Sequence, residues 1–190
     1  MKNGNAAAAR VIDVLNTLGI DFFLAGSYSS NYYGIPRATQ DADFVAVLSN
    51  NIGLLSRELG PEFELDPQTS FEGITGTLRD IFQVPSIPFK IEIFHLSQDA
   101  HDQSRFARKR KVFDEMLGRE VYIPSVEDVV VTKLRWEKRG KRGKDGSDIR
   151  DVIAVQGDEG FDWDYIQRWT EEHGTRELLD EIRSSIPPID

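Results

Sequence analysis

Two aspartates stand two residues apart at the start of an apolar run. Asp41 and Asp43 open the segment Asp41-Ala-Asp-Phe-Val-Ala-Val-Leu48, whose composition predicts a β-strand. Residues i and i+2 project from the same face of a strand, so the two carboxylates would lie side by side. Like charges on an apolar strand repel each other unless a cation is bound, and hard divalent cations prefer carboxylate oxygens. The pair therefore predicts a metal site, and the alternative is a strand end that simply faces water.

A glycine and a serine precede these acids in the chain. Gly26-Ser27 follows the apolar run 21–25, which predicts a buried strand that enters a tight turn, with a short helix over 28–33 behind it. Glycine lets a backbone turn sharply and lets a ligand approach closely. The N–H groups at a helix N-terminus favour phosphate. The turn is therefore a candidate phosphate site, although most strand–turn–helix junctions are only turns.

A third carboxylate lies on a later strand. In Phe89-Lys-Ile-Glu-Ile-Phe94, alternation places Phe89, Ile91 and Ile93 on one face and Lys90, Glu92 and Phe94 on the other. An isolated Glu92 beside Lys90 would also suit an exposed edge strand. If this strand lies beside the strand of Asp41 and Asp43, three carboxylates converge, as a two-metal site for in-line phosphoryl displacement requires.

Several polar residues could support such a site. Arg37, in the loop 35–40, could contact a triphosphate through two parallel hydrogen bonds or pair with a neighbouring acid. Thr39 could bond a phosphate, although threonine is common in loops. Lys133 lies on the rim of an apolar helix face, where a lysine often only extends to solvent. Asp148, on a later helix, could position Lys133 or serve its own helix N-terminus.

The elements that must position these residues follow from apolar periodicity and from glycine and proline signals. The sequence predicts a mixed α/β core over 1–124 and a helical region over 125–190 packed on it. Within the second part, Gly140–Gly146 reads as a charged loop. The predicted helices are 5–18, 28–33, 51–59, 125–138, 148–155, 162–172 and 176–183, and the predicted strands are 21–25, 41–48, 71–80 (or a hairpin), 89–94 and 119–123.

Composition limits the class of protein. The 190 residues are 39% hydrophobic, which is enough for a core, and they contain no cysteine, which excludes disulfides, thiolate metal sites and a thiol nucleophile. No apolar run approaches a membrane span, and the first residues lack a signal-peptide core, so we expect a soluble, cytoplasmic protein.

The charge is unevenly distributed. A net charge of −9 disfavours non-specific nucleic-acid binding. Residues 105–144 nevertheless hold 13 basic and 6 acidic side chains. This segment is either a solvated surface or a patch that faces RNA or a polyphosphate.

Taken together, Leu24-Ala-Gly-Ser27, Asp41-Ala-Asp43-Phe44 and Ile91-Glu92-Ile93 resemble the signature of DNA polymerase β-type nucleotidyltransferases. The segment from Tyr33 to Asp43, with an arginine and a threonine before the acids, is similar to small bacterial AbiEii toxin-like nucleotidyltransferases. The later segments 125–135 and 148–151 resemble the helical part of those proteins. The resemblance covers roughly residues 20–155.

The resemblance implies an α/β nucleotidyltransferase core, a mixed sheet flanked by helices, with a C-terminal helical region. Gly26, Ser27, Arg37, Thr39 and Lys133 would bind a nucleoside triphosphate. The catalytic residues Asp41, Asp43 and Glu92 would hold Mg²⁺ or Mn²⁺, and Glu92 would help activate an acceptor hydroxyl. The acceptor could be RNA, and a toxin would have a cognate antitoxin; no membrane is involved.

Two other interpretations remain at this stage. The fold could serve as a non-catalytic nucleotide-binding or protein-interaction module, with the acids as a cation site. A metal-dependent phosphohydrolase could use the same acids without needing the Gly-Ser turn. The position of Glu92 discriminates, because two-metal transfer requires its strand to be a neighbour of the strand that carries Asp41 and Asp43. Its being a glutamate, where aspartate is commoner, changes the metal geometry.

Overall fold

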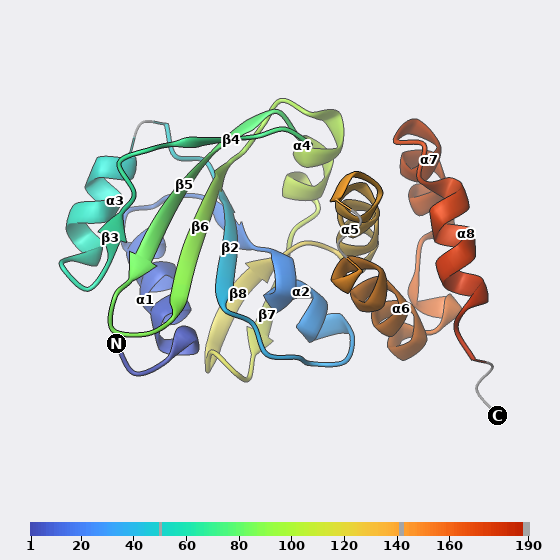
Figure 1. The fold of residues 1–190 in the computed structure, drawn as a ribbon, viewed down its shortest axis with the longest axis horizontal. Helices are drawn as coiled ribbons and strands as arrows, with labels where there is room; N and C mark the ends of the chain where they lie inside the picture. The colour runs from blue at the N-terminus through green and yellow to red at the C-terminus, as the bar shows by residue number, and fades with distance from the viewer. Residues whose placement is uncertain (50, 141–142, 188–190) are drawn as a thin grey trace. The chain divides into compact units, whose positions relative to one another are not determined.

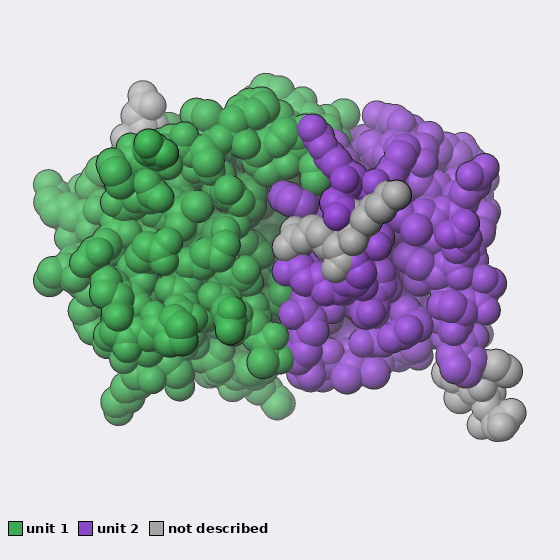
Figure 2. Space-filling model, viewed as in Figure 1, with its two compact units in different colours: residues 1–28, 38–124 green, residues 29–37, 125–190 purple. Residues whose placement is uncertain are grey.

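The computed structural model describes residues 1–49, 51–140 and 143–187, which form two compact units (Figure 2). The first unit comprises residues 1–28 and 38–124. The second comprises residues 29–37 and the chain from 125 onward. Helix α2 (Gly26–Tyr33) therefore begins in the first unit and ends in the second.

The first unit is built on a mixed β-sheet (Figure 1). Its strands follow the order β1-β2-β6-β5-β3, and β4 also pairs with β5. Strands β2 and β6 run parallel, and the other pairs are antiparallel. The bounds in this unit are α1 (Gly4–Thr17), β1 (Phe22–Leu24), β2 (Asp41–Ala46), α3 (Ile52–Leu59), β3 (Glu64–Leu65), β4 (Ser70–Glu72), β5 (Thr77–Val84), β6 (Phe89–His95), α4 (Ala100–Ala107), β7 (Arg110–Asp114) and β8 (Arg119–Ile123).

One face of the sheet forms the main core. Phe44 of β2, Ile91 and Ile93 of β6 and Phe82 of β5 are fully buried on this face. Helix α1 packs against β2 and β6, and it approaches so closely that a Cβ on Gly4 would lie 2.4 Å from the Phe89 ring. Burial of these apolar side chains is the main force that fixes the strand register.

The opposite face is only partly covered. Phe23 and Val45 form an apolar cluster with Phe106 of α4, and Phe94 packs against it. The rest of this face carries the charged side chains of β2 and β6. Strands β7 and β8 form a separate two-stranded sheet beside β1.

The second unit is helical. Besides residues 29–33 of α2, it contains α5 (Val126–Gly140), α6 (Lys144–Gln156), a 3₁₀ turn (Asp158–Gly160), α7 (Trp163–Glu172) and α8 (Arg176–Ser184). Its core includes Leu134, Ile149, Val152, Ile166 and Leu179.

The predicted fold class, a mixed α/β sheet with a C-terminal helical region, is confirmed. Most predicted elements lie within two residues of their observed bounds, and the segment 71–80 is a hairpin of β4 and β5. Strands β3 and β7 and helix α4 were not predicted from the sequence.

The predicted loop Gly140–Gly146 is wrong at both ends. Helix α5 extends to Gly140, and α6 already begins at Lys144, with Gly143 as its N-cap at φ +53°. Lys141 and Arg142 lie outside the described residues. In the part of the chain that the structure describes, no helix is long and apolar enough to span a bilayer.

Candidate active site

Asp41 and Asp43 begin β2 and lie on the face of the sheet opposite the main core. Both are partly exposed, whereas Ala42 between them is buried on the core side. The alternation of β2 therefore places the two carboxylates on one face, as the i, i+2 spacing predicts.

The Gly26–Ser27 turn lies directly against Asp43. The Ala25 N–H donates to the Asp43 carbonyl oxygen at 2.7 Å. Gly26 has φ +59°, and a Cβ added to it would lie 1.8 Å from Asp43 Oδ2. Both the left-handed backbone and the contact require glycine here. Ser27 is buried in the first turn of α2.

Glu92 lies beside Asp43, because β6 pairs with β2 in a register that opposes Asp43 to Glu92 and Asp41 to Lys90. The strand adjacency that two-metal chemistry needs is therefore present. The contacts of the carboxylate are with cations: Lys90 Nζ donates to Oε1, and Arg79 Nη1 donates to Oε2 at 3.2 Å. Glu92 is 5% exposed, so these two contacts compensate a buried charge.

The donor set is partly suited to a metal ion. Asp41 and Asp43 supply hard oxygen ligands on one face, and the glycine at position 26 leaves room beside Asp43. Both oxygens of Glu92 contact cations, Lys90 Nζ at Oε1 and Arg79 Nη1 at Oε2. Among the described residues, no group of three or more histidine, cysteine, aspartate or glutamate side chains is arranged to hold a metal ion.

Thr39 contacts the carboxylate of Asp41. Its hydroxyl donates to Asp41 Oδ1 at 2.8 Å. The structure thus shows Thr39 orienting Asp41, a contact that the sequence prediction, which assigned Thr39 to the nucleotide, did not include.

Arg37 and Lys133 lie in the second unit and share one acid there. Arg37 Nε and Nη2 donate to Asp148 at 2.7 and 2.8 Å, and Lys133 Nζ donates to Asp148 Oδ2 at 2.7 Å. Lys133 also contacts Asp145 at 3.2 Å. The four side chains form a cluster of two cations and two anions.

The electrostatics of this cluster favour the charged form of Asp148. Burial raises the pKa of Asp148, but the hydrogen bonds and charges of Arg37 and Lys133 outweigh it and hold the pKa below its ordinary value. The arrangement favours the interpretation in which Arg37 pairs with an acid, and it shows Asp148 positioning Lys133.

Tyr28 lies next to the turn, in the same unit as the acids. Its hydroxyl donates to Asn5 Oδ1 at 2.8 Å. Burial, together with the negative charges of Asp114 and Asp41, raises the pKa of the phenol above its ordinary value. Tyr28 therefore remains protonated at neutral pH.

Sequence reasoning missed Arg79 as part of this site and treated Lys90 only as a solvated neighbour. The alternation of β6 already placed Lys90 on the face of Glu92. Arg79 lies thirteen residues before Glu92, and only the antiparallel pairing of β5 with β6 brings the two together.

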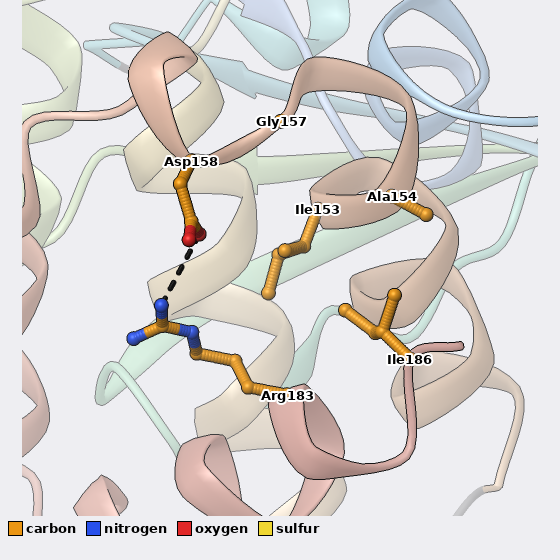
Figure 3. Close-up of a pocket in the computed structure, with 6 residues that line it drawn as sticks. All are labelled: Ile153, Ala154, Gly157, Asp158, Arg183 and Ile186. Atoms are coloured by element: carbon orange, nitrogen blue, oxygen red, sulfur yellow. Dashed lines mark hydrogen bonds and ion pairs between the residues drawn. The ribbon is translucent and has the colours of Figure 1, made fainter. Parts of the chain in front are cut away.

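A pocket of about 370 Å³ lies in the second unit (Figure 3). Ile153, Ala154, Gly157 and Ile186 line it, and Arg183 pairs with Asp158 at 3.1 Å at its side. None of the predicted site residues contributes to this pocket.

Comparison with known proteins gives matches to structures only. No protein-family model and no curated protein matches the sequence. The antibiotic-resistance factor ANT(2'')-Ia in solution matches with a TM-score of 0.62 at 9% identity, covering 95% of this chain and 96% of that one. A nucleotidyltransferase-like antigenic protein from Paracoccidioides brasiliensis gives 0.60 at 18%, covering 99% and 95%. ANT(2")-Ia in complex with adenylyl-2"-tobramycin gives 0.62 at 10%, covering 91% and 98%. The chain therefore has a nucleotidyltransferase-like fold.

Proposed function

We propose that this protein is a nucleotidyltransferase that moves a nucleoside monophosphate from a nucleoside triphosphate to an acceptor hydroxyl, with Mg²⁺ or Mn²⁺ as cofactor. The observation that carries the proposal is the contact of Gly26 with Asp43. It joins a phosphate-type turn to the two aspartates on a nucleotidyltransferase-like fold.

The turn would hold the triphosphate. Gly26 and Ser27 open α2, and a helix N-terminus favours an anion because it carries the positive end of the helix dipole. The absence of a side chain at Gly26 lets phosphate oxygens approach the backbone beside Asp43.

Asp41 and Asp43 would hold the divalent cation, and Thr39 keeps the Asp41 carboxylate oriented. The bound cation would neutralise charge that develops on the phosphoryl oxygens. The acceptor oxygen forms a bond to the α-phosphorus, the bond from that phosphorus to the β-phosphate oxygen breaks, and pyrophosphate leaves. We assign the proton of the acceptor hydroxyl to Glu92, which must exchange a cation contact to receive it.

We also assign Arg37 and Lys133 to the nucleotide. In this assignment Asp148 is a positioning residue that holds both cations. The expected effect of Arg37→Ala is a higher KM for the nucleoside triphosphate.

As acceptor we propose RNA, in an AbiEii-like toxin that has a cognate antitoxin. The basic segment 105–144 and the cations beside Glu92 support an anionic acceptor. If the protein is a toxin, induced expression arrests growth of the host cell, and the variant without its two aspartates does not.

The test of the reaction uses α-³²P-labelled nucleoside triphosphates with Mg²⁺, and either cellular RNA or tobramycin as acceptor. The wild type should label RNA, and the double variant Asp41→Asn/Asp43→Asn should not. Asp164→Asn, an exposed aspartate of α7, serves as the matched control and should retain activity.

A second candidate function is a non-catalytic nucleotide-binding module. The observation that favours it is the double ion pair of Glu92, which occupies both oxygens of the third acid. Nucleotide binding that depends on Mg²⁺, without label on any acceptor, would select this function.

A further inference from the structure

Lys90 and Arg79 reach solvent from the same face of the sheet as the acids. Their side chains are 40% and 28% exposed, whereas the Glu92 side chain that they contact is 7% exposed. A molecule that approaches β6 and β5 on this face therefore meets an ammonium and a guanidinium group before it meets Glu92.

The surroundings of Arg79 restrict its position. Its guanidinium lies over the Phe94 ring at 5.8 Å from the centroid, and its Nε donates to Ser70 Oγ at 3.0 Å. Lys90 is opposite Asp41 in the register of β2 and β6. The two cations thus both contact the Glu92 carboxylate. Lys90 belongs to β6, the neighbour of β2, and Arg79 belongs to β5, the next strand.

The strand order places the turn and these cations on opposite sides of the aspartates. Gly26 follows β1, which pairs with one edge of β2, while β6 pairs with the other edge and β5 lies beyond it. Phosphoryl transfer is in line, so the attacking and leaving oxygens lie on opposite sides of the phosphorus. With the triphosphate at the turn, pyrophosphate leaves toward β1 and the acceptor hydroxyl enters over β6 and β5.

We propose that Lys90 and Arg79 form a subsite for a phosphate group of the acceptor, next to the hydroxyl that is modified; this inference rests on the proposed function. A guanidinium binds phosphate through parallel hydrogen bonds, and an ammonium adds a compact point charge. Without acceptor, Glu92 pairs with both cations, and its single negative charge offsets one of their two positive charges. A phosphate takes over this role, which releases the Glu92 carboxylate. A polycationic acceptor such as an aminoglycoside meets repulsion at the same place.

The test measures binding apart from catalysis. The probe is a short fluorescein-labelled single-stranded oligouridylate at low salt, without metal or nucleoside triphosphate, followed by fluorescence anisotropy. Lys90→Gln and Arg79→Gln should each weaken binding about tenfold, because each removes one charge-assisted contact. Each should also reduce the slope of log K against log salt by about 0.7, the value for one phosphate contact on a single strand.

Two further sets of variants complete the design. Arg57→Gln is the matched control, since Arg57 is also a cation paired with a glutamate, at 3.1 Å from Glu58, and lies outside the basic segment 105–144; this variant should bind as the wild type does. Lys90→Arg and Arg79→Lys should retain most of the affinity. Glu92→Gln keeps both cations and removes the carboxylate charge that partly offsets theirs, so it should bind the probe more tightly. It remains informative if a glutamine variant at the other positions fails to fold.

The outcomes separate the subsite from the reaction. Unchanged affinity in Lys90→Gln and Arg79→Gln, an equal loss in Arg57→Gln, or no gain in Glu92→Gln overturns the subsite. If these variants behave as expected but the wild type labels no acceptor, the subsite is supported and the proposed reaction fails. If the wild type labels tobramycin, while the affinity for oligouridylate does not depend on Lys90 and Arg79, the reaction stands and the subsite is wrong.

Discussion

Glycine 26 combines two constraints that can be separated by experiment. Its φ of +59° disfavours any side chain, and a Cβ would overlap Asp43 Oδ2 at 1.8 Å. Gly19 has a similar φ of +64° but has no atom within 4 Å of its Cβ position. Substitutions at Gly19 and at Gly26 therefore separate the cost of backbone strain from the effect of displacing Asp43.

Gly26→Ala should displace Asp43 and reduce nucleotide transfer about 100-fold, on the scale of other small misplacements in active sites. Gly19→Ala should cost only about 1 kcal/mol of stability and leave transfer intact. Kinetics and urea unfolding of both variants test this. Equal activity in the two would mean that the position of Asp43 does not depend on the turn.

The lowered pKa of Asp148 makes the stability of the second unit depend on pH. Because the folded-state pKa lies below the unfolded one, the cluster stabilises the fold above the unfolded pKa of about 3.9 and loses this contribution as pH falls through the folded value. Asp148→Asn should cost about 2–3 kcal/mol at pH 7, since Lys133 keeps Asp145.

The same substitution should flatten the loss of stability in acid. Urea unfolding of the wild type and of Asp148→Asn over a pH series from 7 downward measures this difference. The two free energies of unfolding should converge at low pH, and a constant gap across the range would contradict the role of the charge.

At the scale of elements, helix α4 shows why one part of the fold escaped prediction. Its buried residues are His101, Asp102, Arg105 and Phe106, which follow helical spacing but are mostly polar. An apolar pattern is therefore absent. The helix contains a buried ion pair, in which Arg105 Nε donates to Asp102 Oδ1 at 2.5 Å. Asp99 caps its N-terminus.

This arrangement predicts two unequal effects in α4. Asp99→Ala removes a cap and should cost about 1 kcal/mol. Asp102→Ala removes the anion from a buried pair that also accepts from Ser97 Oγ at 2.6 Å, and should cost about 3 kcal/mol or more. Chemical unfolding of the two variants tests the ratio, and equal losses would show that the pair adds nothing beyond the cap.

The carboxylates illustrate what the sequence could predict. Strand alternation was enough to predict that Asp41 and Asp43 share one face of their strand, and that Lys90 and Glu92 share one face of theirs. The parallel pairing of β2 with β6 depends on burial of Phe44, Ile91 and Ile93 against α1, a long-range effect that local patterns do not contain. The contacts of Glu92 with Arg79, and of Arg37 and Lys133 with Asp148, depend on tertiary structure in the same way.

At the scale of the whole molecule, the second unit is assembled from two separate stretches of chain. Within it, Gln156 Nε2 donates to the Tyr33 carbonyl at 2.7 Å, and Arg37 pairs with Asp148. Gly34 packs against Val152: a Cβ added to Gly34 would lie 3.0 Å from the Val152 backbone nitrogen. Division of the chain at residue 125, as the sequence predicts, would leave residues 29–37 on the other side of the cut.

A fragment of residues 125–190 should therefore be less helical and less stable than the same helices in the full chain. Circular dichroism of the fragment, with and without a peptide of residues 29–37, measures this effect. The peptide should restore helix content, and its Arg37→Ala form should restore less. A fragment that is fully helical alone would show that the early segment is dispensable.

The two-part origin of the second unit also sets an order of assembly on the ribosome. The strands that carry Asp41, Asp43 and Glu92 are complete once residue 95 has been made. Arg37 must await Asp148 and the rest of α6, which at about 5–20 residues per second takes roughly 6–24 seconds after it leaves the peptidyl-transferase centre. During translation the acids can thus come into register before the cluster that holds Arg37 and Lys133 exists.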